Sequence, residues 1–279
     1  MTSDWSILPL LLLAALLHAS WNALTKRSSD PLLAIWLVTL SGGLVAGAAT
    51  LFVSFPARAA WPYLVGSLVL HVTYQLFLAY AYAKGDLSQV YPIARGLAPC
   101  VVAGMAALYA GESLPPARAL GMSLATFSIA SLALGPGFRP SAEALGAAVT
   151  TGLLIGAYTY VDAQGVRLSN EPFDFIAWSL FLDAAPITIA AILLRAREIP
   201  AYLRTQLGYG IGGGLMASLA YSIVLWSMSR ASMASVAAIR ETSVIFAALI
   251  GTRLLGEPFG VRRTLASAGV AAGIALLTR

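Results

Sequence analysis

Residues 7–25 read ILPLLLLAALLHASWNALT, an apolar run of about the length that a helix needs to cross a hydrocarbon core of about 30 Å. Asp4 is the charged residue that precedes this run, so it lacks the positively charged start of a signal peptide. The run also continues past His18 and Ala19 to Leu24. We therefore predict that it forms an uncleaved first membrane helix.

Continuous apolar segments of similar length recur along the rest of the chain. Hydrophobic residues make up 59% of the sequence and charged residues 10%, whereas a soluble domain carries roughly 25% charged residues. This composition excludes a water-soluble globule and intrinsic disorder. The continuous runs also exclude the alternating pattern of a membrane β-barrel. We predict an all-α integral membrane protein with ten transmembrane helices, at residues 7–25, 32–54, 62–83, 87–110, 117–135, 142–162, 173–194, 207–229, 232–252 and 261–278.

Several kinds of chemistry lack the residues that they require. The single cysteine, Cys100, excludes a disulfide framework and a thiolate zinc site. The sequence has no phosphate-binding P-loop, no G-x-S-x-G and no H-E-x-x-H motif, so ATP hydrolysis and an intramembrane enzyme are not expected. The basic residues stand singly or in pairs between apolar runs, which is typical of helix flanks and not of a nucleic-acid surface. We expect no cofactor, no metal ion and no nucleic-acid partner.

The two halves of the chain correspond at an offset of about 140–147 residues. The matched positions are His18 and Asn22 with Tyr158 and Asp162, Tyr74 with Tyr221, Lys84 with Arg230, Arg95 with Arg240, and Gly111-Glu112 with Gly256-Glu257. Because each half holds an odd number of spans, the second half must enter the membrane upside down. We predict two inverted five-helix repeats, residues 1–140 and 141–279, with a substrate site between them near the midplane.

Two sets of residues carry a family resemblance that covers nearly the whole chain. One set is the end of the first span, Trp21-Asn22-Ala23-Leu24-Thr25-Lys26. The other is a repeated signature, from Gly85-Asp86-Leu87-Ser88 through Arg95 to Gly111-Glu112-Ser113-Leu114 and from Ala231-Ser232-Met233 through Arg240 to Gly256-Glu257-Pro258-Phe259. In these residues the sequence resembles the EamA family of the drug/metabolite transporter superfamily.

The resemblance implies a function and an orientation. It is to bacterial amino-acid exporters of the aromatic type, and it implies a secondary exporter of amino acids with broad specificity in the inner membrane. Export of another small metabolite or drug is the alternative. The resemblance implies that both termini are cytoplasmic, whereas the distribution of loop Lys and Arg favours termini outside. We expect the family orientation, because each half is built to work either way round.

Polar and ionisable side chains at membrane depth are the candidates for substrate binding, because burying them in lipid is unfavourable. His71 and Gln75 share a helix face, and Asp162 and Glu241 could accept from an ammonium group. The full set of predicted substrate-binding residues is His18, Trp21, Asn22, His71, Tyr74, Gln75, Tyr82, Tyr91, Arg95, Tyr158, Asp162, Tyr221, Arg240 and Glu241.

Each candidate also has a purely structural interpretation. Buried polar side chains can hold helices together through hydrogen bonds, and Arg240 and Glu241 could be neutralised by each other or by Asp183. Glu112 and Glu257 stand at helix ends, where we expect capping. The glycine pair Gly269 and Gly273 predicts packing within a monomer, with a dimer through this pair as the alternative. Protonation of Asp162, Asp183 or Glu241 could couple export to protons.

Overall fold

The computed structural model describes residues 6–25, 28, 30–84, 87–133, 141–255 and 261–277, and its regular structure over these residues is helical. The α-helices are α1 (Leu8–Thr25), α2 (Pro31–Ala49), α3 (Trp61–Lys84), α4 (Leu87–Tyr109), α5 (Pro116–Ala133), α6 (Ala142–Leu168), α7 (Pro172–Arg195), α8 (Ile199–Met228), α9 (Met233–Arg240), α10 (Ser243–Leu255) and α11 (Val261–Leu277). Two short 3-10 helices, η2 (Thr50–Phe52) and η3 (Arg58–Ala60), lie between α2 and α3.

The prediction of an all-helical membrane protein is confirmed. Among the described residues, six helical stretches are long and apolar enough to cross a membrane. They are Pro31–Phe52, Arg58–Ala81, Pro92–Tyr109, Ala142–Leu168, Pro172–Arg195 and Ile199–Met228. The first helix is apolar and shorter, over Leu8–Leu24. Ten membrane crossings remain a prediction.

The helix boundaries follow from capping residues in the sequence. Asp30 caps α2, because its Oδ1 accepts from the backbone N–H groups of Leu32 and Leu33 at 2.9 and 3.1 Å. Glu171 and Asp174 form a capping box at the start of α7. In these two helices, a polar residue before the apolar run therefore marks where the helix begins.

The predicted span 232–252 is not one continuous helix, and this is the main correction to the sequence-based spans. The helix breaks between Arg240 and Ser243. Across the break the backbone changes to tighter bonds, from Val244 N–H to Glu241 O at 3.0 Å and from Ile245 N–H to Thr242 O at 2.9 Å. The Thr242 hydroxyl donates to Ile239 O at 2.8 Å, which competes with the regular helical bonding.

Two other helices are longer than predicted. Helix α6 continues to Leu168, six residues past the predicted end at 162, and α8 begins at Ile199 instead of 207. The predicted span 207–229 begins just after Arg204, but a long side chain at a helix end can reach the polar interface while its backbone stays helical. Pro200, in the first turn of α8, suits a helix start.

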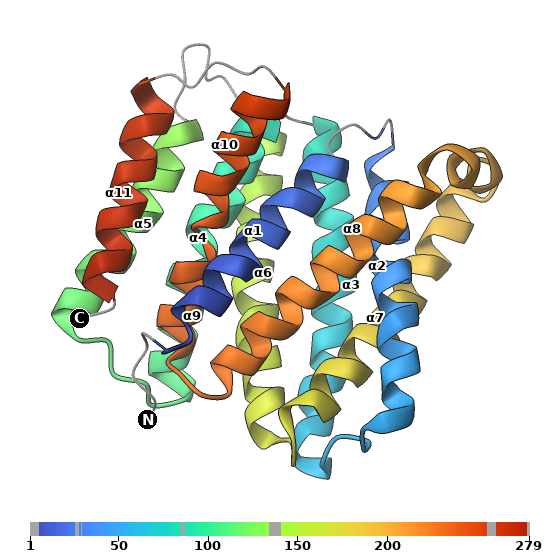
Figure 1. The fold of residues 1–279 in the computed structure, drawn as a ribbon, viewed down its shortest axis with the longest axis horizontal. Coiled ribbons are helices and arrows are strands. Elements are labelled where there is room, and N and C mark those ends of the chain that lie inside the picture. Colours follow the sequence, from blue (N-terminus) through green and yellow to red (C-terminus); the bar gives the residue numbers. More distant parts are fainter. Residues whose placement is uncertain are drawn as a thin grey trace.

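The helices form a bundle in which segments far apart in sequence lie side by side (Figure 1). Helix α2 packs against α7 and α8, and α5 packs against α11. Helix α1 packs against α8, α9 and α10, while α6 packs against α3 and α4. The start of α1 and the end of α11 lie at the same end of the bundle (Figure 1). We call it the terminal end, and the other the distal end.

Glycines of α6, α8 and α11 each lie against a neighbouring helix of the same chain. A Cβ added at Gly156 of α6 would overlap Val101 of α4, and one added at Gly210 of α8 would overlap Leu37 of α2. Gly273 of α11 faces α5, where an added Cβ would lie 2.5 Å from the Gly121 carbonyl oxygen. These glycines let the backbones of neighbouring helices approach closely.

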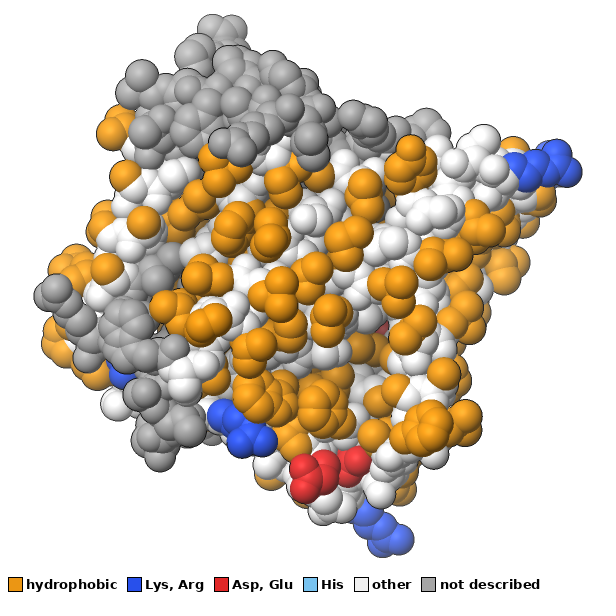
Figure 2. Space-filling view, in the orientation of Figure 1, with side chains coloured by type: hydrophobic (Ala, Val, Ile, Leu, Met, Phe, Trp, Pro, Cys, Tyr) orange, Lys and Arg blue, Asp and Glu red, His pale blue; other side chains and the backbone are white. Residues whose placement is uncertain are grey.

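The outer surface fits a lipid environment. Hydrophobic side chains spread over most of the face in Figure 2, and the coloured Lys, Arg, Asp and Glu side chains lie at its edges. Exposed apolar residues include Leu44, Leu108 and Leu193, with exposed fractions of 63%, 78% and 78%. A face that is largely apolar, with the charged side chains toward its ends, is the pattern of a membrane-embedded protein.

Candidate functional site

Three ionisable side chains from three helices meet inside the bundle, two of them buried and His71 12% exposed. His71 of α3 lies between Asp162 of α6 and Asp183 of α7, with Nε2 3.0 Å from Asp162 Oδ2 and Nδ1 3.3 Å from Asp183 Oδ2. Asp162 is fully buried and Asp183 is 6% exposed. A neutral imidazole donates one hydrogen bond and an imidazolium donates two. The pair of carboxylates therefore matches a positively charged His71.

Neighbouring polar side chains extend this group. Gln75, one turn after His71 on α3, donates its side-chain N–H to Asp183 Oδ2 at 3.0 Å. The Tyr221 hydroxyl of α8 donates to Asp162 Oδ2 at 2.6 Å. We call His71, Gln75, Asp162, Asp183 and Tyr221 the acidic cluster. Four helices contribute to it, so it forms only when both halves of the chain are packed together.

Tyrosine rings surround His71. The centroid of the Tyr158 ring lies 4.2 Å from that of His71, and the Tyr221 ring lies 5.8 Å from it. Tyr74 stacks at a tilt on Tyr158, with centroids 5.1 Å apart. The acidic cluster thus has aromatic faces beside it, which attract cations and pack against apolar rings.

Three acceptor atoms in the acidic cluster have no hydrogen-bond partner among the described residues. They are Asp162 Oδ1, Asp183 Oδ1 and Gln75 Oε1. Each belongs to a residue that is at least nine-tenths buried. A buried acceptor without a donor is unfavourable, so these oxygens are suited to a ligand that brings several donors.

A second group of charged residues lies at the break between α9 and α10. Arg95 of α4 pairs with Glu241 through Nε and Oε2 at 3.0 Å, and the Nε of Arg240 lies 3.6 Å from Glu241 Oε1. Arg95 also donates to the Ser243 hydroxyl at 3.4 Å. We call Arg95, Arg240, Glu241 and Ser243 the basic cluster. Glu241 is neutralised mainly from another helix, as neighbouring side chains on one helix point apart.

Arg240 keeps donor capacity in this arrangement. Its Nε and one terminal nitrogen have no hydrogen-bond partner among the described residues, although the side chain is 4% exposed. Arg240 also lies within electrostatic range of Tyr221, which belongs to the acidic cluster. The two clusters are therefore neighbours, one rich in acceptors and the other in donors.

The residues predicted in the first span lie on the side of the basic cluster. His18 is within electrostatic range of Arg95 and Arg240. Trp21 donates its indole N–H to His18 Nδ1 at 3.3 Å, and the two rings meet edge to face. The Asn22 side chain donates to the His18 backbone oxygen at 2.8 Å, so this contact is within its own helix.

Most of the predicted site residues come together, and a few points differ. Asp183 and Ser243 were not among the predicted binding residues, although Asp183 carried the same signal as Asp162, a carboxylate in the middle of an apolar span. The side chains of Tyr82 and Tyr91 lie outside the described residues, as does Glu257. Within the part of the chain that is described, no group of three His, Cys, Asp or Glu side chains has a metal-binding arrangement.

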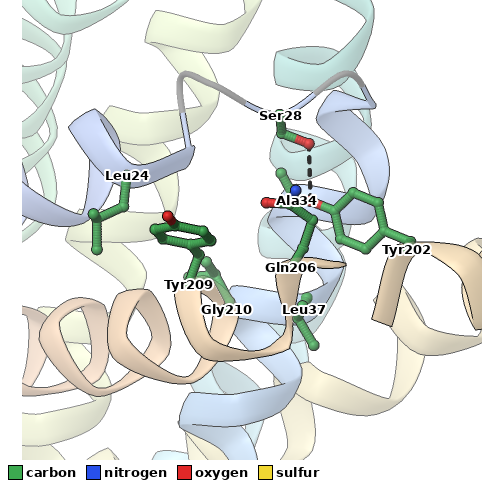
Figure 3. Close-up of a pocket in the computed structure, with 9 residues that line it drawn as sticks. Leu24, Ser28, Ala34, Leu37, Tyr202, Gln206, Tyr209 and Gly210 are labelled. Atoms are coloured by element: carbon green, nitrogen blue, oxygen red, sulfur yellow. Dashed lines mark hydrogen bonds between the residues drawn. The ribbon is translucent and has the colours of Figure 1, made fainter. Parts of the chain in front are cut away.

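A small pocket lies away from both clusters, between α2 and α8 (Figure 3). Leu24, Tyr209 and Gly210 line it, and the Ser28 and Tyr202 hydroxyls hydrogen bond across it at 2.8 Å. Its volume is about 10 Å³, which accommodates roughly one water molecule. It is too small for an amino acid.

Glu112 connects three helices at the terminal end of the bundle. It accepts from the Ser232 hydroxyl and the Met233 N–H, both at 3.0 Å, and pairs with Arg167 of α6 at 2.8 Å. Arg167 also donates to the backbone oxygens of Met228 and Ala231, both at 2.8 Å. Glu112 therefore caps α9, as predicted for a helix-end acid, and ties the α4–α5 loop to the second half.

Comparisons with known proteins agree with this architecture. Over 229 residues the chain is 33% identical to an uncharacterized protein of Pseudomonas aeruginosa, an alignment that covers 80% of this chain and 74% of that protein. A solved crystal structure superposes with a TM-score of 0.79 at 19% identity, over 98% of this chain and 96% of that one, and shows the same fold. Residues 143–279 match the EamA-like transporter family. The second half of the chain is therefore an EamA-like domain of the drug/metabolite transporter superfamily.

Proposed function

We propose that this protein is a secondary exporter of amino acids, including aromatic ones, with its binding site between the two halves of the chain. One observation carries the proposal: a buried cluster with unpaired acceptors adjoins a buried cluster with unpaired donors. A zwitterionic amino acid needs acceptors for its ammonium group and donors for its carboxylate. The match of the second half to a transporter family supports the same class of function.

In this proposal, the donors for the carboxylate come from the basic cluster. Arg240 has two side-chain nitrogens that make no hydrogen bond, Nε, which lies 3.6 Å from Glu241, and one terminal nitrogen. Arg95 is oriented by Glu241 and Ser243. The acidic cluster receives the ammonium group. Tyr74 and Tyr158 stand beside it and supply ring faces for an aromatic or apolar side chain.

The proposed mechanism is alternating access without ATP, between inverted repeats 1–140 and 141–279. The packing of α1 on α8 and α10 has a counterpart in the packing of α6 on α3 and α4, as exchange of two related halves requires. The break between α9 and α10 provides irregular backbone beside the buried clusters, a feature of transporter sites. We further propose cytoplasmic termini in a bacterial inner membrane and a monomeric unit.

Counterflow in proteoliposomes tests the proposal. Vesicles are loaded in turn with aromatic, hydroxylated, aliphatic, acidic and basic amino acids, and uptake of the labelled compound is followed. We expect exchange with a subset that includes phenylalanine, and a loss of at least about tenfold in Arg240→Ala, because the carboxylate loses a charge-assisted partner.

Arg195→Ala is the matched control. Arg195 pairs with Asp30 at 2.9 Å at the distal end and is exposed, so its removal leaves the buried clusters intact. Correctly inserted protein that exchanges no amino acid would refute an amino-acid cargo and point to another small metabolite or drug. Full activity in Arg240→Ala would refute the carboxylate assignment.

A further inference from the structure

The buried charges of the two clusters do not balance without one extra positive charge. The acids are Asp162, Asp183 and Glu241, and the permanent cations are Arg95 and Arg240. Burial of an uncompensated charge is strongly unfavourable. One further proton is therefore required, either on one of the carboxyl groups or on a histidine.

His71 is the side chain best placed to carry that charge. Both of its ring nitrogens face carboxylate oxygens, at 3.0 and 3.3 Å, and the aromatic neighbours from α6 and α8 are Tyr158 and Tyr221. His18, the other histidine, lies near both arginines, where a second positive charge is repelled. Arg240 is the cation nearest to the acidic cluster, through Tyr221.

The same charge could be supplied by a ligand. A primary ammonium group carries one positive charge and three N–H donors, which equals the number of unpaired acceptor oxygens on Asp162, Asp183 and Gln75. With an ammonium bound that brings no carboxylate, a proton on His71 would make the two clusters one charge too positive. Charge balance then requires His71 to release its proton as such an amine binds, whereas an amino acid brings a compensating carboxylate to the basic cluster and requires no release.

We propose that the acidic cluster is also a site for primary amines that lack a carboxylate, in which the ammonium of the ligand replaces the proton held by His71. This inference rests on the proposed function and adds a second class of ligand to the same site. In the exchange the protonated amine enters, the N–H bond of the His71 imidazolium breaks and its proton passes to solvent, so the net buried charge stays constant. An amine that lacks a carboxylate is then a sufficient ligand.

Titration calorimetry of the full chain in detergent tests this exchange. 2-Phenylethylamine is the probe, and 3-phenylpropionate, which keeps the ring and replaces the amine with a carboxylate, is the comparison ligand. Each titration is run at neutral pH in phosphate and in HEPES, neither of which is a primary amine and whose different ionisation enthalpies reveal protons released on binding. We expect the amine to bind with release of about one proton per molecule.

His71→Gln and Asp183→Asn separate the exchange from simple binding. The glutamine variant should bind the amine with no proton release. The asparagine variant should bind it at least about tenfold more weakly, because a charge-assisted acceptor is lost. Monodisperse elution from a size-exclusion column verifies the fold of each variant. If one variant does not fold, the other still tests the amine site.

Three results would overturn the amine site. They are binding without proton release in the unaltered protein, unchanged release in His71→Gln, and absence of amine binding up to about 10 mM, which exceeds the usual KM range. Counterflow of phenylalanine could persist in each case, and then the amine assignment alone would fail. If phenylalanine does not exchange but the amine binds with proton release, the amino-acid cargo would fail instead.

Discussion

Glu241→Gln should destabilise the protein by leaving two buried arginines without their carboxylate. Glu241 is fully buried, and Arg95 and Arg240 are each 4% exposed. The substitution keeps the shape of the side chain and removes its charge, so the three residues change from a net charge of +1 to +2. Removal of one partner from a buried ion pair costs about 3–5 kcal/mol. Polar contacts between membrane helices are weaker, about 0.6 kcal/mol on average. We therefore expect Glu241→Gln to lower the free energy of unfolding by about 3 kcal/mol, at the lower end of the range for buried ion pairs.

The double variant Arg95→Gln/Glu241→Gln identifies the cause. It restores the net charge of +1, so it should regain a large part of the lost stability, with a coupling energy of at least about 1 kcal/mol. Stability is measured by SDS titration in mixed micelles, followed by tryptophan fluorescence. Glu143→Gln is the control, because Glu143 forms an exposed pair with Lys84 at 3.2 Å and should change stability by at most about 1 kcal/mol.

Two outcomes would refute this reasoning about the basic cluster. A loss below about 1 kcal/mol in Glu241→Gln would mean that the arginines are not held by the carboxylate. Additive effects in the double variant would mean that Arg95 and Glu241 do not interact energetically, despite the 3.0 Å between their charged atoms.

Three further substitutions test the packing of α6, the contacts at the terminal end and transport. Gly156→Ala should destabilise the bundle by about 1–3 kcal/mol, because the added methyl group overlaps α4. Gly146→Ala is the control, since Gly146 lies on the same helix with open space beside it. Equal losses of stability for the two variants in the SDS titration would contradict this prediction. Glu112→Ala should lower stability by about 1–2 kcal/mol, because the α9 cap is lost, and an effect no larger than that of Glu143→Ala would argue against capping. Asp162→Asn should reduce phenylalanine counterflow at least about tenfold with normal elution; unimpaired counterflow would remove this residue from the site.

Local sequence signals predicted the helices well and their irregularities poorly. The start of α2 could be placed because Asp30 precedes Pro31 and an apolar run. The break after Arg240 was missed because Glu241 and Thr242 stand in an otherwise apolar stretch, and a single polar step does not by itself end a helix. At the break Glu241 pairs with Arg95, which lies on a helix far away in the sequence.

The candidate site shows the same division. A polar side chain in the middle of an apolar span is conspicuous, so His71, Asp162 and Arg240 could be named as candidates without a structure. Sequence could not tell which of them meet. Asp183 was left out of the predicted site, and its contact with His71 crosses 112 positions of the chain.

From its sequence alone, this chain could be predicted to be a helical membrane protein that resembles a transporter family. Those properties reside in apolar runs, capping residues and motifs, which are local along the chain. Only the tertiary structure shows that one histidine bridges two aspartates and that a basic cluster lies beside them. These arrangements depend on how helices from both halves pack, and that packing is set by shape and by charge balance in a dry interior, neither of which can be read from a single segment.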